Sequence, residues 1–361
     1  MKIFQILPVL AFGDAVGNDT RALKDALTEA GYDNDIYAAV IDERLPKGTA
    51  QPYDMMEKIE DDDIVIYHLS TGHELNEKFK KLGGRKIILY HNVTPEKYFK
   101  EYNRGAYLNC KNGLKDTREL ADTPEMAIAD SEYNRQDLIS YGYNCEIKVL
   151  PILIPFEDYE KKPSQKIINK YKNDGYVNIL FTGRVVPNKK QEDIIDAFYY
   201  YKKFINPKSR LILVGSYAGI DRYHEQLEAY VKALDLEDVI FTGQIKFDEI
   251  LAYYRVADVF LCMSEHEGFC VPLLEAMCFD VPVIARDTSA IAGTLGGSGI
   301  LLPDNNPMVA AEMINRVVTD RNLKETIVKN QRVRLKDFDN KVVKKQFLQI
   351  IEEFINKRDS L

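Results

Sequence analysis

The stretch YVNILFTGRVVPNKKQEDIIDAFYYYKKFI, residues 176–205, holds the pattern that decides the fold. It begins with an apolar run typical of a strand buried on both faces, and it ends with apolar residues at helical spacing. A polar loop separates the two parts. A strand followed by a loop and a helix is the unit from which parallel sheets covered by helices are built.

This unit recurs along the chain. The strand-like IFQILPVL at 3–10 is followed by the helix-like DTRALKDALTEAGY at 19–32, for which Asp19 or Thr20 is the expected cap. Short apolar segments that end in polar residues lie at 63–70 and 85–92, and further strand-like segments lie at 209–217, 238–245 and 258–265. The repetition predicts an α/β fold of two Rossmann-like, doubly wound domains facing a central cleft at the carboxyl ends of their strands.

A break in this rhythm marks the predicted domain boundary. Between 151 and 175 the chain carries prolines and mixed charge before the pattern restarts. We therefore predict an N-terminal domain at 1–160 and a C-terminal domain at 161–338. A terminal helix is expected at 339–361, with an apolar side made of Val342, Val343, Phe347, Ile350, Ile351 and Phe354.

Composition and charge exclude several classes of partner. The chain has 361 residues and a formal net charge of -8, so no broad positive field favours nucleic acid. Its five cysteines include no C-x-x-C pair, which indicates neither a disulfide framework nor a zinc site. We read Cys262, Cys270 and Cys278 as ordinary core residues. No apolar run approaches the roughly 20 residues of a membrane-spanning helix, and we expect a cytoplasmic protein.

Cations cluster in the loop that follows the opening strand. Arg184 lies just beyond the strand, and Lys189 and Lys190 come shortly before the helix. A helix start favours anions through its backbone amides and its dipole, so a diphosphate site is one interpretation. Solvated surface charge is an equally weighted alternative on this pattern alone.

Two carboxylates flank a second loop, EHEGFCVPLLEAM at 265–277. If a helix begins near Val271 or Pro272, the amides of residues 268–271 face an anion while Glu267 and Glu275 accept hydroxyls. This combination suits a phosphorylated, polyhydroxylated ligand. In the alternative interpretation, Glu267 is a capping residue and Glu275 is a surface charge. The spacing of the two carboxylates alone does not favour either interpretation.

Taken together, these segments resemble a known family. SEHEGFCVPLLEAM followed by VPVIARDTSA, with FTGRVVPNKKQED upstream, resembles the donor-binding half of retaining GT-B glycosyltransferases of family four. FGDAVGNDTRAL is similar to the glycine-containing first loop of that family. ILYHNVTPEKYF is similar to the strand-end histidine segment of its members that assemble bacterial polysaccharides or lipid-linked glycans. The resemblance extends from about residue 10 to about residue 300.

The resemblance implies roles for individual residues on the donor side. Glu267 would accept hydrogen bonds from hydroxyls of the donor sugar, and Glu275 from the ribose. Arg184 and Lys189 would neutralise the diphosphate leaving group, with Lys190 the less favoured partner. Backbone amides near the helix start would touch sugar and phosphate, and the residues concerned are Gly268, Phe269, Cys270 and Val271.

Three implied contacts come from the first domain, and a fourth from a later loop. Gly13 and Asp14 would lie across the cleft near the donor phosphates, and His91 would meet the sugar near its sixth carbon. Gln244 lies in the expected base-contacting loop. The terminal helix would cross back onto the N-terminal domain. No metal and no cofactor is implied, because cations of the chain can neutralise the diphosphate.

This sequence departs from the commoner family pattern in two places. The first loop has Gly-Asp-Ala-Val-Gly where a denser glycine run is usual. Lys189 is followed by Lys190 where glycine is usual, so which lysine reaches the diphosphate is left open.

The predicted function is a metal-independent, retaining transfer of a hexosyl or deoxyhexosyl group from a nucleotide-diphosphate sugar to a glycan or lipid-linked acceptor. A nucleotide-sugar epimerase of the same fold and a non-catalytic nucleotide-sugar-binding subunit are the alternatives. Residues 94–120 combine aromatic and basic residues, so they indicate an acceptor side with peripheral membrane contact at the inner face, or a plain amphipathic helix. His68 and His73, at another strand end, indicate acceptor contact or loop polarity with equal weight.

Overall fold

The computed structural model describes residues 1–357, and the chain in it divides into two compact units. The first unit comprises Met1–Lys97, Gly105–Ile154 and the chain from Asp337 onward, and the second comprises Tyr98–Arg104 and Pro155–Lys336. The second unit thus begins at Pro155, where the sequence predicted 161, and it also takes in a short segment of the first half. Of the terminal helix predicted at 339–361, residues 358–361 lie outside the described part.

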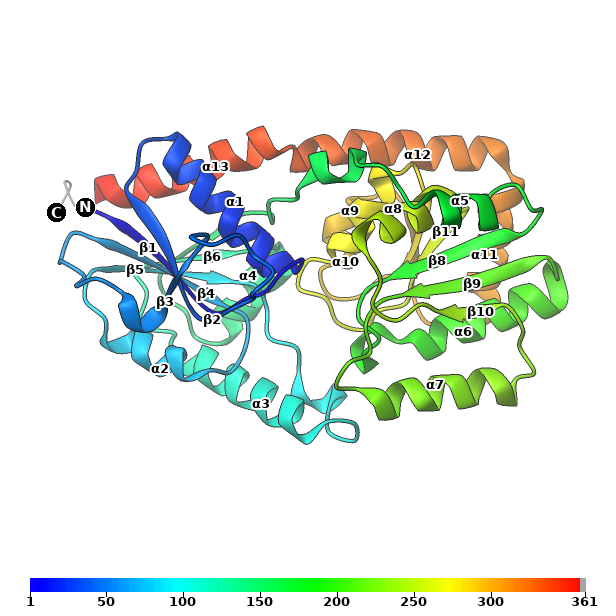
Figure 1. Ribbon diagram of the computed structural model, residues 1–361, viewed down its shortest axis with the longest axis horizontal. Coiled ribbons are helices and arrows are strands. Elements are labelled where there is room, and N and C mark those ends of the chain that lie inside the picture. The colour runs from blue at the N-terminus through cyan, green and yellow to red at the C-terminus, as the bar shows by residue number, and fades with distance from the viewer. Residues whose placement is uncertain (358–361) are drawn as a thin grey trace. The chain divides into compact units, whose positions relative to one another are not determined.

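The first unit is built on a seven-stranded sheet with the strand order β3-β2-β1-β4-β5-β6-β7 (Figure 1). All neighbouring strands are parallel. The strands are β1 (Ile3–Leu10), β2 (Asn34–Ile41), β3 (Gln51–Pro52), β4 (Ile64–Leu69), β5 (Arg85–Tyr90), β6 (Met126–Ala129) and β7 (Glu146–Val149).

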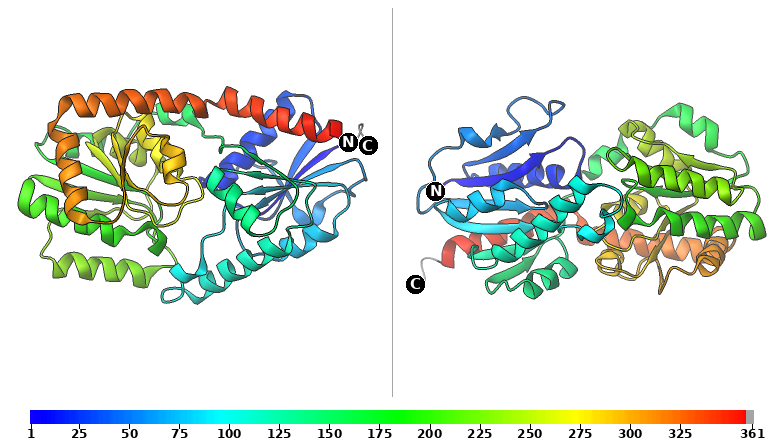
Figure 2. Two further views of the ribbon diagram at one scale, coloured as in Figure 1. Left: turned by 180° about the vertical axis from the view of Figure 1, so that it is seen from behind. Right: turned by 90° about the horizontal axis from the view of Figure 1, so that it is seen from below.

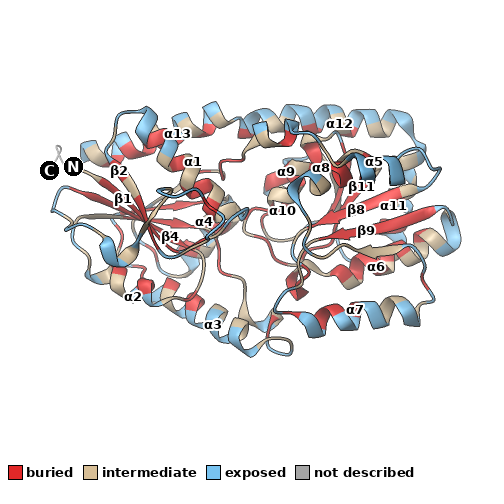
Figure 3. Cartoon of the chain, in the orientation of Figure 1, coloured by how far each residue is buried: buried red, intermediate tan, exposed pale blue. Residues whose placement is uncertain are grey.

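Helices cover both faces of this sheet, which explains why its strands are apolar throughout. Consecutive residues of β1 enter different cores, Ile3 on one face and Phe4 on the other. The core on the side of Ile3 takes residues from α1 (Ala15–Glu29) and α13 (Asn340–Asn356). The opposite core takes residues from α2 (Glu74–Lys81), α3 (Arg104–Glu119) and α4 (Glu132–Ser140). Figure 3 shows the strands as the buried layer between them.

The start of α1 corrects two expectations. The helix begins at Ala15, and its cap is Asp14, whose Oδ1 accepts a hydrogen bond from the amide of Gly17 at 2.6 Å. Asp19 and Thr20 therefore do not cap it; both are buried inside the helix, and Asp19 Oδ1 accepts from the amide of Leu153. A cap one turn earlier was available because Asp14 meets the N3 amide, as capping requires.

The terminal helix α13 packs on the first unit through most of its predicted apolar side. Val343, Phe347 and Phe354 are among its buried residues. Val342 is 41% exposed, so its expected place on this side is wrong, since the neighbouring Val343 takes the inward position. Figure 2 shows α13 beside the sheet of this unit from two further directions.

The second unit has a six-stranded parallel sheet with the order β10-β9-β8-β11-β12-β13. Its strands are β8 (Val177–Thr182), β9 (Ser209–Val214), β10 (Val239–Phe241), β11 (Val259–Cys262), β12 (Val283–Arg286) and β13 (Ile300–Leu302). Its α-helices are α5 (Gln165–Tyr171), α6 (Gln191–Tyr200), α7 (Asp221–Ala233), α8 (Phe247–Val256), α9 (Val271–Cys278), α10 (Ile291–Leu295), α11 (Pro307–Thr319) and α12 (Arg321–Leu335).

Helix pairs cover this second sheet as well. Helix α6 contacts α11, α5 contacts α8, and α9 contacts α12 (Figure 1). The opening stretch of sequence forms β8, a short 3-10 turn at Pro187–Lys189 and α6, as its pattern predicts. Among the described residues, no helix combines the length and the apolarity that crossing a membrane requires.

Candidate functional site

The strand order places a switch point in each sheet. Chain order reverses between β1 and β4 in the first unit, and between β8 and β11 in the second. In open parallel sheets, ligands bind beyond the carboxyl ends of the strands at such points. The loop with Arg184 and Lys189 follows β8, and the loop with Glu267 follows β11. The fold therefore brings the two sequence motifs of the second unit to one edge of its sheet.

Lys189 and Glu267 form a buried ion pair at this edge. The Lys189 Nζ lies 2.6 Å from both carboxylate oxygens of Glu267. The Glu267 side chain is 7% exposed and that of Lys189 is 18% exposed. Burial is the largest single effect and lowers the pKa of Lys189, but the charge and hydrogen bond of Glu267 together with smaller effects of neighbouring groups outweigh it, so the pKa is raised. Lys189 thus stays protonated beside the Glu267 carboxylate, which it contacts through both oxygens.

Hydrogen bonds of Asn188 and Ser289 fix the loops that carry the pair. Asn188 accepts from the amide of Glu265 at 2.8 Å and donates through its side chain to the carbonyl of His266 at 3.1 Å. The amide of Glu267 donates to the hydroxyl of Ser289 at 2.9 Å. The loop after β8 is therefore hydrogen-bonded directly to the loop after β11. Asn188 was not predicted, although it lies between Arg184 and Lys189 in the same loop.

The remaining predicted cations and Gln244 lie outside this pair. Lys190 is in a left-handed conformation (φ 53°) and its Nζ contacts Glu192 at 2.9 Å. Its backbone thus takes a conformation that glycine adopts more readily, at the position where the family usually has glycine. Arg184 and Gln244 are both exposed, Arg184 after β8 and Gln244 beyond the edge strand β10.

Helix α9 begins at Val271, which matches the position expected from the proline that follows. Gly268 and Val271 are half-buried, whereas Phe269 and Cys270 are buried. The Phe269 carbonyl accepts from the hydroxyl of Thr294. Cys270 precedes the helix in a left-handed conformation (φ 73°), which is unusual for a residue with a side chain.

Glu275 is held by two tyrosines and is not a surface charge. Its Oε1 accepts from the hydroxyl of Tyr159 at 3.0 Å, and its Oε2 from that of Tyr254 at 2.7 Å. Burial raises the pKa of Glu275, and the two phenol hydrogen bonds oppose that effect. An ionised carboxylate accepts about four hydrogen bonds, so two acceptor positions remain for a ligand. Neither tyrosine was predicted, because their approach to α9 is set by packing alone.

Two thiols complete the surroundings of Glu267. The ligand atoms of Cys262, Glu267 and Cys270 all lie within 4.8 Å of one another, and all three residues are buried. The burial of the two thiols agrees with the core reading of these cysteines, but their contact with the candidate site was not anticipated.

In the first unit, Gly13 and Asp14 form the turn between β1 and α1. Gly13 has a positive φ of 78°, and Asp14 is engaged as the cap of α1. Gly17 must also be glycine, because a Cβ there would lie 2.7 Å from the carbonyl oxygen of Ala11. The turn between β1 and α1 is therefore compact.

His91 belongs to a buried chain of polar side chains in the first unit. Its Nδ1 lies 3.0 Å from Asp130 Oδ2, and its Nε2 lies 3.0 Å from Nδ1 of His68. His68 Nε2 in turn lies 3.0 Å from Gln5 Oε1. Burial is the largest single effect and lowers the pKa of His91, but Asp130 together with the smaller effects of Asp19 and Asp14 outweighs it, so the pKa is raised. Burial and the charge of His91 lower the pKa of His68.

This chain revises the expectations for the histidines. The His91 side chain is 1% exposed and has a partner at each ring nitrogen, so the implied sugar contact requires the ring to exchange one of them. His68 lies inside β4 and is fully buried, so the readings of acceptor contact and of loop polarity are both wrong. His73 caps α2. Sequence analysis missed Asp130, whose signal was its place directly after a strand.

Asp19 gives this unit a pH dependence. Burial raises the pKa of Asp19 to about 7, so the folded protein keeps this carboxyl protonated where the unfolded chain has lost the proton. Its contribution to stability is present below about pH 4 and is lost as the pH rises to about 7. Asp19→Asn changes the free energy of unfolding at both pH values. We expect that change to be more favourable at pH 8 than at pH 4 by roughly 2–4 kcal/mol.

Thermal unfolding at the two pH values, followed by circular dichroism, measures this difference. The matched control is Asp25→Asn, which changes an exposed carboxyl on the same helix and should shift both values equally. An equal effect of Asp19→Asn at pH 4 and pH 8 would show that the buried carboxyl is not protonated in the folded state.

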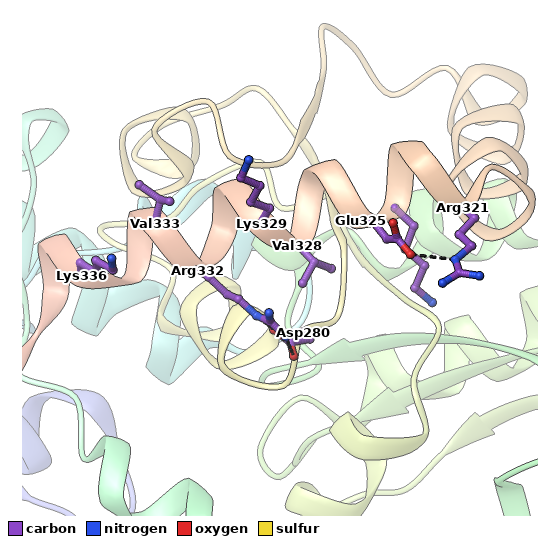
Figure 4. Close-up of a pocket in the computed structure, with 9 residues that line it drawn as sticks. Asp280, Arg321, Glu325, Val328, Lys329, Arg332, Val333 and Lys336 are labelled. Carbon is purple, nitrogen blue, oxygen red and sulfur yellow. Dashed lines mark hydrogen bonds and ion pairs between the residues drawn. The ribbon is translucent and has the colours of Figure 1, made fainter.

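A surface pocket on the second unit lies apart from these residues. It is lined by Asp280 and by residues of α12 and its end, including Lys329 and Arg332 (Figure 4). Arg332 makes an ion pair with Asp280, and Arg321 makes one with Glu325. Exposed ion pairs of this kind contribute little stability. No predicted site residue lines this pocket.

Comparison with known proteins agrees with the motifs of the second unit. Residues 163–334 match the family model of glycosyl transferases group 1. An uncharacterized glycosyltransferase of Methanocaldococcus jannaschii is 28% identical over 217 residues, which are 58% of this chain and 54% of that protein. An N-acetyl-D-galactosaminyltransferase of Campylobacter jejuni is 27% identical over 181 residues, 49% of this chain and 48% of that enzyme. The chain spans about half the length of these relatives.

Solved structures extend the likeness to the whole fold. HepE of Anabaena, solved in complex with UDP and glucose, superimposes with a TM-score of 0.75. The match covers 98% of this chain and 100% of HepE at 17% sequence identity. The chain therefore has the GT-B fold, with a Rossmann-like sheet in each unit, and its residues 163–334 are similar to the glycosyl transferases group 1.

Proposed function

We propose that the protein is a retaining, metal-independent glycosyltransferase. It moves a hexosyl or deoxyhexosyl group from a nucleotide-diphosphate sugar to a glycan or lipid-linked acceptor, in surface polysaccharide biosynthesis. The single observation that carries the proposal is the buried ion pair of Lys189 and Glu267 at the switch point of the second sheet.

The pair suits the charge changes of glycosyl transfer. When the bond to the anomeric carbon breaks, positive charge develops on the sugar and negative charge on the departing diphosphate. A lysine fixed beside that diphosphate stabilises the charge only as it appears, which lowers the barrier. Glu267, oriented by Lys189, accepts hydrogen bonds from sugar hydroxyls on the other side. The leaving phosphate itself takes the acceptor's proton, so no separate carboxylate base is needed.

Glu275 supplies the nucleotide end of the proposed site. Its two remaining acceptor positions fit the pair of adjacent ribose hydroxyls, while Tyr159 and Tyr254 keep the carboxylate in one orientation. Arg184 is the proposed second partner of the diphosphate. In the first unit, Gly13 and Asp14 are proposed to meet the donor phosphates, and His91 the sugar.

Names of related proteins support the two substrate classes. HepE was solved with UDP and glucose, which favours a nucleotide-sugar donor. The name of the Campylobacter enzyme includes a glycan on diNAcBac-PP-undecaprenol, which favours a lipid-linked acceptor here. The basic and aromatic segment at 94–120, which includes α3, is the proposed acceptor side and the proposed contact with a membrane surface.

A donor panel tests the proposal. Purified protein in EDTA is incubated with UDP-, GDP- and dTDP-sugars and with polyprenyl-diphosphate-linked glycans, and released nucleoside diphosphate is measured. We expect release with one donor, undiminished by EDTA, and a product whose anomeric configuration by NMR equals that of the donor. Inversion of the anomer, or activity only with added divalent metal, would contradict the mechanism.

The same experiment separates the alternatives. Conversion of the donor to an isomer without any acceptor would identify an epimerase, and donor binding by calorimetry without turnover would identify a binding subunit. Glu275→Gln should weaken binding of the nucleoside diphosphate by roughly 10–100-fold, as loss of hydrogen bonds to a charged group does. Glu225→Gln, an exposed change on α7, is the matched control.

A further inference from the structure

We propose that Cys262, Cys270 and Glu267 form a binding site for a soft divalent cation such as Zn²⁺, and that the bound cation takes Glu267 away from Lys189. The site lies inside the proposed donor site but has a different chemistry, because it binds a metal through two thiolates. Its inhibitory effect rests on the proposed function, whereas the binding itself does not.

The geometry of the three ligand atoms fits a small tetrahedral ion. They lie within 4.8 Å of one another, and around Zn²⁺ two such ligands are about 3.5–3.8 Å apart, given bond lengths near 2.0–2.3 Å. Cys262 ends β11 and Cys270 directly precedes α9, so both thiols are carried by rigid elements of the second unit. Only a small closing movement is needed.

The donor set selects for soft metals. Two thiolates and one carboxylate favour Zn²⁺ or Cd²⁺ over Mg²⁺ and Ca²⁺, which prefer oxygen ligands. Ser264 Oγ lies 3.3 Å from the Cys262 sulfur and can hydrogen-bond to the thiolate that the metal requires. With three protein ligands, the fourth position is left for water or a hydroxyl of a ligand.

The charge of the cluster does not oppose metal binding. With both thiols protonated, Glu267 and Lys189 cancel, and the cluster is neutral. A divalent cation that displaces the two thiol protons leaves two thiolates, one carboxylate, the metal and the lysine, which again sum to zero. The exchange therefore buries no extra net charge, which is the usual barrier to an ion in a buried site.

Competition for Glu267 is the functional consequence. Both of its oxygens bind Lys189, so a metal that coordinates Glu267 lies close to the ammonium group, and the two cations repel each other and compete for the carboxylate. The displaced lysine and the immobilised carboxylate are the two groups on which the proposed transfer depends. Binding of Zn²⁺ at this site should therefore inhibit the enzyme.

Titration with Co²⁺ and Cd²⁺ tests binding directly. Reduced protein is titrated anaerobically, and the near-ultraviolet absorption of metal–thiolate bonds is recorded. We expect saturation at one equivalent in the wild type. Loss of a group that only supports a metal ligand weakens binding by roughly 10–100-fold. Cys270→Gly removes a ligand itself, so it should weaken metal binding by more than that. Glycine suits the left-handed backbone at 270, so this variant should fold at least as well as the wild type.

Matched variants make the result decisive. Cys278→Ala removes a thiol of the same helix from outside the cluster and should leave the titration unchanged. Lys189→Met removes the competing ammonium group and should tighten binding. An absorption change that survives in Cys262→Ser/Cys270→Gly, or its absence in the wild type, would overturn the site.

Activity is measured separately with the donor that the panel identifies. Zn²⁺ should inhibit the wild type and the Cys278→Ala variant but not Cys270→Gly. Metal binding without inhibition would overturn the competition for Glu267 and leave the site. A chain that binds Co²⁺ as expected but turns over no donor would instead contradict the proposed function.

Discussion

Glu267→Gln is expected to lower kcat for glycosyl transfer by about 10²–10³-fold, the usual cost of removing one oriented group that stabilises a transition state. The substitution keeps the shape of the side chain and removes its charge. Lys189, which lies 2.6 Å from both oxygens of Glu267, then loses its charged partner. The amide that replaces the carboxylate is no longer held in position for the donor sugar by an ion pair. Initial rates of nucleoside diphosphate release, with the donor saturating, measure this loss.

Glu265→Gln is the matched control for that experiment. Glu265 precedes Glu267 by two residues, and its carboxylate lies 3.9 Å from the Nζ of Lys190, outside the ion pair. We expect kcat within about twofold of the wild type, because this long contact between two partly exposed side chains carries little energy. Unchanged turnover in Glu267→Gln would place the transfer chemistry elsewhere and remove the basis of the proposed mechanism.

Lys189→Met is expected to lower the free energy of unfolding of the second unit by about 3–5 kcal/mol, the cost of leaving a buried charge without its partner. Glu267 is 6% exposed, so water cannot replace the lost ammonium group. The loss comes from the Glu267 carboxylate, which stays buried without a partner. The double variant Lys189→Met/Glu267→Gln should therefore recover most of the lost stability but remain inactive. Denaturant unfolding followed by circular dichroism, together with the activity assay, measures both effects.

Lys190→Met separates this prediction from a general effect of lost positive charge. Lys190 pairs with Glu192 at 2.9 Å with a side chain 27% exposed, so we expect a change below about 1 kcal/mol. If Lys189→Met were as stable as the wild type, the carboxylate would not depend on the lysine, and the ion pair could not orient Glu267.

Much of the fold could be predicted from local patterns. The strands at 3–10 and 177–182 and the helix starting at Val271 were readable, because apolar runs, helical spacing and a proline are local signals. The start of α1 was not readable in the same way. Both Asp14 and Asp19 are suitable caps by residue type, and only the tertiary contact of Asp19 with Leu153 decides between them.

The same distinction between local patterns and tertiary contacts applies to the candidate site. Sequence alone determined that the chain has a parallel α/β architecture in two domains. It also identified Lys189 and Glu267 as residues at strand ends, because periodicity and loop position can be read from the chain itself. The tertiary structure decided their direct contact, the tyrosines on Glu275, the burial of His91 against Asp130 and the meeting of Cys262 with Cys270. These contacts join residues on different strands and helices, and packing of the elements sets which side chains meet.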